Sequence, residues 1–104
     1  MKKTFSFGKS KVSLIGHAAF IGCKSLKELK LPNSVKKIEG IAFKKCRSLK
    51  KVTIGKKIES IGKGAFRRCN GLKTLKIKNK KMRKYAKSSK GRRELGLSRS
   101  VVVK

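Results

Sequence analysis

The residues best suited to chemistry in this chain are three cysteines and one histidine. Cys23, Cys46 and Cys69 lie 23 residues apart, and His17 precedes the first of them. Thiolate and imidazole groups bind zinc when four of them converge on a tetrahedral centre. In a stacked repeat the cysteines would instead form a row about 4.8 Å apart, and the chain has no C-x-x-C pair. We therefore expect a row of buried free thiols, with at most one disulfide and no metal site.

Acid–base and nucleophilic chemistry have little material to use here. The chain has 4 acidic residues, all glutamate. His17 shares its repeat phase with Lys63 two intervals later, which predicts a histidine that faces solvent. The run Gly62-Lys63-Gly64 is similar to part of a phosphate loop but lacks the remaining residues of either known pattern, so we expect Gly16, Gly62 and Gly64 at tight corners. The sequence predicts a protein without a catalytic residue, cofactor or metal.

A 23-residue period must position these side chains. Aromatic, thiol and aliphatic residues recur at that interval, and one such unit cannot bury its own apolar side, whereas stacked units cover one another. The aliphatic positions include Leu26, Leu49 and Leu72, followed by Leu29, Val52 and Leu75. The predicted structural core is centred on Phe20, Phe43, Phe66, Cys23, Cys46 and Cys69.

Each unit is expected to combine strands with turns. Alternation over residues 26–31 places Leu29 and Leu31 on the buried face of a main strand. Residues 35–38 suit a second, shorter strand. The AF-x-x-C spacing of residues 42–46 brings its apolar side chains to one side of a single helical turn.

At 104 residues the chain is expected to be one domain in three parts. Residues 1–11 form an N-terminal partial coil or cap, in which Phe5 and Phe7 alternate as in a short strand. Residues 12–80 hold three 23-residue repeats. Residues 81–104 form a basic C-terminal cap.

That cap is predicted to contain a short helix and a strand. Met82, Tyr85 and Ala86 stand at i, i+3 and i+4, which indicates an amphipathic helix, and Gly91 is expected to end it. Residues 101–103 are apolar and β-branched, and we expect them to pair with the exposed edge of the last coil.

These patterns resemble the BspA-like leucine-rich repeats of bacterial surface proteins. The similarity rests on the AF pair at 42–43, Cys46, Leu49 and the LPNSV run at 31–35, and it covers roughly residues 12–80. The resemblance implies a curved leucine-rich-repeat solenoid of short strands, turns and single helical turns. It also implies a protein-interaction or adhesion module, without catalysis, outside a cell or on its surface.

The chain departs from the common pattern of this family in several respects. It is richer in lysine, has few units, and its start, MKKTFSFGKSK, has no apolar segment of a signal peptide. No run of about 18 apolar residues predicts a membrane span. The asparagine ladder of ordinary leucine-rich repeats is expected to be missing, because that phase reads Ser34, Lys57 and Lys80.

Charge is the feature that points to a partner. The chain carries 32 Lys and Arg against 4 acidic residues, a formal net charge of +28, and this attracts nucleic acid, anionic glycans and acidic proteins. The outward strand face, a candidate binding face, carries Lys27, Lys30, Lys50, Lys51, Lys73 and Lys76. A second basic strip consists of Lys44, Lys45, Arg47, Arg67 and Arg68. Like charges on neighbouring strands repel, and a bound polyanion would relieve that repulsion.

The sequence therefore predicts a monomeric, non-enzymatic binding module for a protein or an acidic polymer. The alternative is an intracellular nucleic-acid or polyanion binder that reads backbone charge without sequence specificity. Tyr85 is the single aromatic candidate for base stacking outside the repeat core, which disfavours stacking-type recognition. A third interpretation is that the lysines serve solubility alone.

Overall fold

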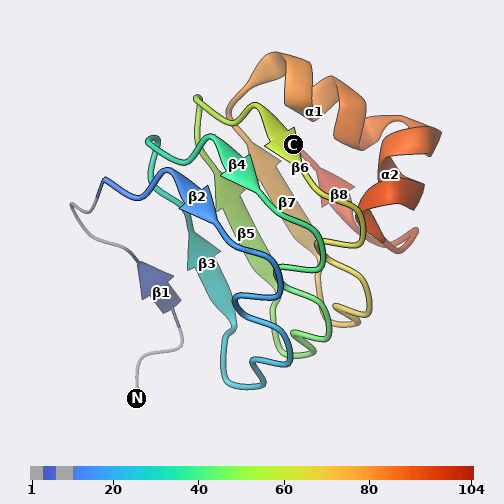
Figure 1. Cartoon of the computed structure of the whole chain (residues 1–104). Helices are drawn as coiled ribbons and strands as arrows, with labels where there is room; N and C mark the ends of the chain where they lie inside the picture. The colour runs from blue at the N-terminus through green and yellow to red at the C-terminus, as the bar shows by residue number, and fades with distance from the viewer. Residues whose placement is uncertain (1–3, 7–10) are drawn as a thin grey trace.

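The computed structural model describes residues 4–6 as backbone and residues 11–104 in full. The elements follow one another along the chain as short strands and two terminal helices (Figure 1). They are β1 (Thr4–Ser6), β2 (Leu14–Ile15), β3 (Glu28–Lys30), β4 (Lys37–Ile38), β5 (Lys51–Ile54), β6 (Ser60–Ile61), β7 (Thr74–Ile77), α1 (Lys80–Lys87), α2 (Ser89–Leu95) and β8 (Val102–Val103).

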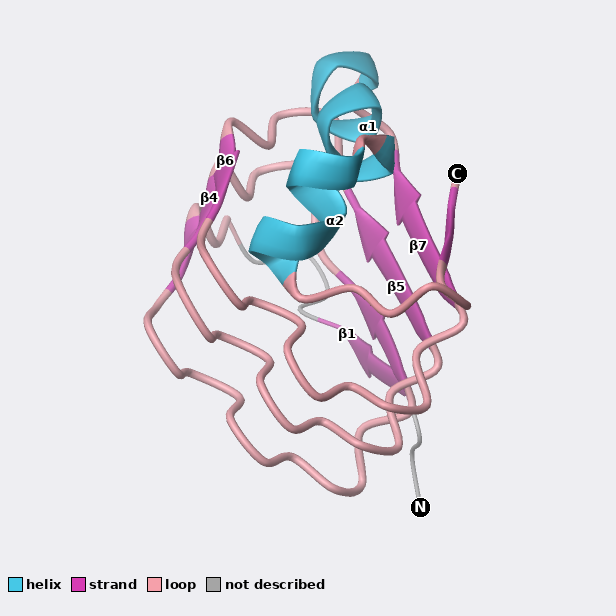
Figure 2. Ribbon diagram, turned by 90° about the vertical axis from the view of Figure 1, so that its right-hand side faces the viewer, coloured by secondary structure: helices cyan, strands magenta, loops and turns pink. Residues whose placement is uncertain are grey.

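Two parallel sheets are built from successive repeats. One has the order β1-β3-β5-β7-β8 and the other β2-β4-β6. Leu29 pairs with Val52 and Val52 with Leu75, so the register advances by one repeat of 23 residues per strand. The sheets stand on opposite sides of the molecule, joined by layers of turns (Figure 2). The predicted main strand, second strand and repeat register are confirmed.

The first strand extends this register to the N-terminal segment. Phe5 lies opposite Leu29 in the parallel pair β1–β3, as its alternating pattern predicted. Phe7, the other residue of that prediction, lies outside the described residues.

A column of aromatic rings fills the space between the sheets. The ring of Phe43 stacks on Phe20 at a centroid distance of 5.3 Å and on Phe66 at 5.6 Å. Phe43 and Phe66 are buried, as are Cys46 and Cys69, while Phe20 and Cys23 are half-buried because they belong to the outermost complete repeat. The predicted core is confirmed, with partial exposure at its first layer.

The predicted single helical turn is wrong. Residues 42–46 form consecutive turns, with Lys44 N–H donating to the carbonyl of Ile41 at 3.1 Å. Ile41 and Lys45 have φ angles of 48° and 63°, which lie in the left-handed region and cannot belong to a right-handed helix.

The reason lies in the backbone hydrogen bonds between repeats. Phe43 N–H donates to the carbonyl of Ala65 at 2.9 Å, and Lys45 N–H donates to Arg67 at 2.8 Å. A helical turn would direct these amides along its own axis. The turns instead point them at the next repeat, which makes this side of the stack a ladder without being a sheet.

The corner glycines have different roles. Gly64 has a φ of +66°, as expected of a tight corner, whereas Gly16 and Gly62 do not have positive φ. A side chain at Gly62 would overlap the backbone nitrogen of Gly40, so this glycine is required by close contact between repeats.

The C-terminal cap contains two helices where one was predicted. Asn79 caps α1 by accepting a hydrogen bond from Met82 N–H at 2.9 Å. Ser88 ends α1 and caps α2, since its hydroxyl accepts from Gly91 N–H at 3.0 Å. The prediction that Gly91 ends a helix is wrong: it lies inside α2, where a side chain would clash with the carbonyl of Tyr85.

The predicted terminal strand is confirmed. Val102 and Val103 pair in parallel with Thr74 and Leu75 of β7. Arg92 of α2 fixes the approach to this strand, because its guanidinium donates to the carbonyl of Ser98 at 2.9 Å and to that of Val101 at 2.5 Å. α1 and α2 cover the end of the stack, and their Ala86 and Leu95 are fully buried.

A partial asparagine ladder is present, one position earlier in the repeat than expected. Asn33 Oδ1 accepts from Lys56 N–H at 3.2 Å, and Asn79 Nδ2 donates to the carbonyl of Lys56 at 2.9 Å. The expectation that the ladder is missing, based on the phase of Ser34, is therefore wrong. Lys56 interrupts the ladder, which is why the sequence alone did not reveal it.

Candidate binding surfaces

The predicted strand-face lysines all lie on the outward side of the five-stranded sheet or at its leading edge. Lys27, Lys30, Lys50, Lys51, Lys73 and Lys76 are all exposed. Lys50 N–H donates to the carbonyl of Lys27 at 2.8 Å, and Lys73 N–H donates to Lys50 at 2.9 Å. These three residues therefore form a row of one cation per repeat, with no acidic side chain in the row.

Two further rows cross the same face. Lys30, Thr53 and Lys76 are neighbours on β3, β5 and β7. In the adjoining row Lys51 lies beside Glu28, which is half-buried. Neighbouring strands are about 4.8 Å apart, so the structure gathers the predicted lysines into one surface with closely spaced charges.

The second basic strip lies on the turns that lead into this sheet. It comprises Lys44, Lys45, Arg47, Arg67 and Arg68. Lys44 is half-buried and the others are exposed. The C-terminal cap covers part of the strip, since a side chain at Gly96 would approach Arg67 Cα to 2.8 Å. Arg47 stands three residues before Lys50, so the strip adjoins the strand-face lysines.

The three cysteines form the predicted row of free thiols. Cys46 Sγ donates to the carbonyl of Phe20 at 3.1 Å, and Cys69 Sγ donates to Phe43 at 3.0 Å. Hydrogen bonding with Cys46 and burial raise the pKa of Cys69. A thiol with a raised pKa stays protonated and is a poor nucleophile or metal ligand.

In residues 4–6 and 11–104 no group of three or more His, Cys, Asp or Glu side chains is placed to hold a metal ion. His17 is exposed, as predicted, and its backbone N–H donates to Glu39 Oε1 at 3.1 Å. In the same part of the chain no helix is both long enough and apolar enough to cross a membrane.

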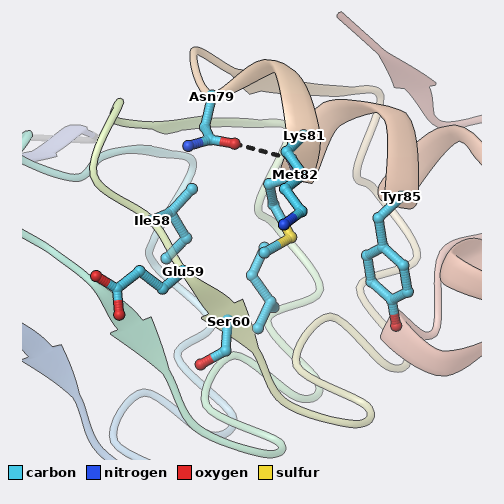
Figure 3. Close-up of a pocket in the computed structure, with 8 residues that line it drawn as sticks. Ile58, Glu59, Ser60, Asn79, Lys81, Met82 and Tyr85 are labelled. Atoms are coloured by element: carbon cyan, nitrogen blue, oxygen red, sulfur yellow. Dashed lines mark hydrogen bonds between the residues drawn. The ribbon is translucent and has the colours of Figure 1, made fainter.

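Sequence reasoning missed a pocket of about 540 Å³ between β6 and α1 (Figure 3). Its walls combine one repeat with the cap, which meet because the chain folds back after β7. The lining residues are Ile58, Glu59, Ser60, Ile61, Asn79, Lys81, Met82 and Tyr85. The one signal in the sequence was the apolar spacing of Met82 and Tyr85.

Tyr85 is anchored at one wall of this pocket. Its hydroxyl donates to the carboxylate of Glu94 in α2. Burial, together with this hydrogen bond and the negative charge of Glu94, raises the pKa of Tyr85 to about 12. The same hydrogen bond, and then the charge of Lys90, lower the pKa of Glu94.

Comparison with known proteins gives a family but no individual relative. Neither the curated proteins nor the solved structures contain a match to this chain. The family model described as a BspA type leucine rich repeat region (6 copies) matches residues 3–90. This match covers most of the chain and agrees with the register of the parallel strands, so the chain belongs to the BspA-type leucine-rich-repeat family.

Proposed function

We propose that this protein is a short leucine-rich-repeat solenoid that acts as a non-enzymatic binding module and holds an acidic partner at a cell surface. The observation that carries the proposal is the row Lys27, Lys50 and Lys73, which repeats one exposed cation per layer. Family membership supports a repeat-based binding role, and proteins of this family are typically surface-associated.

The spacing of the cations suits a polymer better than a small anion. Each repeat adds a charge about 4.8 Å from the last, so a flexible chain of sulfates, phosphates or carboxylates meets a new cation at every step. Thr53 and Thr74, in the adjoining rows, present half-buried side chains whose hydroxyls can donate to anionic oxygens. Lysine is a point charge on a flexible stem, so binding should depend on charge density more than on a fixed anion geometry.

The test uses two variants of equal net charge. In the first, the six strand-face lysines are changed to glutamine. In the matched control, six exposed lysines elsewhere are changed, namely Lys36, Lys37, Lys56, Lys57, Lys63 and Lys90. Affinity for a sulfated glycan and for duplex DNA is measured across a salt series, because binding through exposed charges weakens as salt screens them.

We expect tight, salt-sensitive binding by the unmodified protein that the first variant loses and the control largely keeps. Stronger binding to the glycan supports a surface role, whereas stronger binding to DNA supports the backbone-directed nucleic-acid alternative. Equal losses in the two variants would mean that overall charge, and not the strand face, attracts the polymer.

A further inference from the structure

The two sheets end differently where the repeats meet the C-terminal cap. In the five-stranded sheet, β8 pairs with β7 and covers its edge. In the three-stranded sheet, β6 is the last strand and pairs with β4 alone. Figure 1 shows α1 and α2 beyond this edge without a strand between them.

The hydrogen bonds of β6 show which of its groups are open. Ser60 N–H donates to the carbonyl of Lys36 at 3.3 Å, and Gly62 N–H donates to Ile38 at 2.7 Å. The carbonyls one repeat later in the same phase are those of Glu59 and Ile61, which point away from β4. Within the described residues no hydrogen bond reaches either of these carbonyls. They form the acceptor edge that each inner repeat offers to the next one.

The pocket lies beside this edge and has apolar walls. Ile58 and Ile61 form one wall and Met82 and Tyr85 the other (Figure 3). The counterpart of Ile61 in the preceding repeat, Ile38, is fully buried because the next layer covers it, whereas Ile61 keeps 8% of its surface exposed. At about 540 Å³ the pocket falls within the range of roughly 300–1,000 Å³ that is usual for ligand sites.

Charge indicates what occupies the site. Lys81 lines the pocket, Lys57 and Lys63 are exposed at either end of the segment that contains β6, and Glu59 is the single acidic lining residue. A second copy of a chain with a net charge of +28 would be repelled. An acidic segment of another protein would be attracted.

We propose that the edge of β6 binds an extended segment of a partner protein as an additional parallel strand. A large apolar side chain of that segment enters the pocket, and acidic residues beside it face Lys57 and Lys81. Strand addition of this kind takes affinity from backbone hydrogen bonds and specificity from side-chain pockets. The site is separate from the strand-face lysines, and its recognition of a partner is directional.

The geometry fixes which amides of the partner donate. In β6 the outward-facing residue Ser60 donates to the preceding strand, while inward-facing Ile61 contributes to the core. By the same alternation, the acidic outward-facing residues of the bound segment donate to the carbonyls of Glu59 and Ile61. The amides of its apolar residues point away from β6.

The experiment uses a fluorescent peptide of alternating glutamate and leucine residues, with the full protein chain, at physiological salt. Two further peptides are N-methylated, one at every glutamate amide and one at every leucine amide. Polyglutamate of equal charge is the fourth probe. We expect methylation at glutamate to abolish binding, methylation at leucine to leave it within about twofold, and polyglutamate to bind at least tenfold more weakly.

A matched pair of protein variants tests the position of the site. Lys81→Glu reverses a charge at the pocket and should weaken binding about fivefold, whereas Lys84→Glu, exposed on the same helix but outside the pocket, should have a smaller effect. Equal binding of the two methylated peptides, polyglutamate binding as tightly as the alternating peptide, or equal effects of the two variants would overturn the proposal.

Discussion

The phenylalanine of the middle repeat has more neighbours of its own kind than any other core residue. Phe43 lies between Phe20 and Phe66, with interplanar angles of 15° and 8°, and is fully buried. Each ring covers the next in the way that whole repeats cover one another. The repeat phase of a residue thus determines its burial, and the layer it belongs to determines how complete that burial is.

Replacing Phe43 by alanine should lower the free energy of unfolding by about 3–5 kcal/mol, because the cavity would open inside a fully packed layer. Phe20→Ala is the matched comparison and should cost less, since Phe20 is already half-buried. Urea unfolding curves measure both. An unchanged midpoint for Phe43→Ala would contradict the assignment of the core.

The hydrogen bond from Tyr85 to Glu94 should give the cap a defined pH dependence. The pKa of Tyr85 is raised to about 12 in the folded protein, above about 10 in the unfolded chain. Its contribution to stability is therefore full below about pH 10 and is lost as the pH rises toward 12. The pKa of Glu94 is lowered, so its contribution is present above about pH 4.3 and is lost as the pH falls further.

The measurement is the difference in unfolding free energy between the unmodified protein and Tyr85→Phe as a function of pH. We expect a constant difference between about pH 5 and pH 10 that shrinks on both sides. Taking the difference removes the titration of the many lysines, which is common to both proteins. A difference that grows above pH 10 would have the wrong sign for this account.

At the scale of elements, the sequence predicted what repeats and missed what does not. The strands and their register follow from apolar positions that recur every 23 residues, such as Leu29, Val52 and Leu75. The turn at 42–46 was misassigned because helical spacing and stacked turns both bring its apolar side chains to one side. Only the position of the next repeat, which accepts from Phe43 N–H, distinguishes them.

The cap was harder to predict for a related reason. Its two helices join at Ser88, which caps one and ends the other, and no periodicity marks such a junction. The pocket depends on this fold-back, since Met82 and Tyr85 meet Ile58 and Ile61 only after the chain reverses. The strand-face lysines, by contrast, lie within the repeat, and their common surface followed from their phase.

The turns also predict a stabilising substitution. Lys45 has a φ of 63°, and left-handed backbone costs a residue with a side chain roughly 1–2 kcal/mol. The corresponding residue of the first repeat is Gly22, with a φ of 71°. Lys45→Gly should therefore stabilise the fold by about 0.5–1 kcal/mol after the entropy cost of glycine is included.

The matched control is Arg47→Gly, which is also exposed and cationic but does not have positive φ. This substitution gains nothing from left-handed backbone and should destabilise the protein by roughly 0.5–1 kcal/mol. Thermal or urea unfolding of the two variants gives the comparison. Equal destabilisation by both would show that the turn geometry at Lys45 is not as described.

At the scale of the whole molecule, an uncharged interior is combined with a net charge of +28. The buried residues are all apolar, and the cations lie on the strands and turns that enclose them. Self-repulsion of this size weakens a compact state. An acidic partner would reduce the repulsion as it binds, so binding and stability should increase together.

The measurement that tests the central claim most directly is the affinity of the two variants of equal net charge for one sulfated glycan at one salt concentration. The account predicts that removing the six strand-face lysines abolishes binding, while removing six lysines elsewhere leaves most of it. Equal affinities of the two variants would contradict it, because the placement of the charge on the strand face would then have no role.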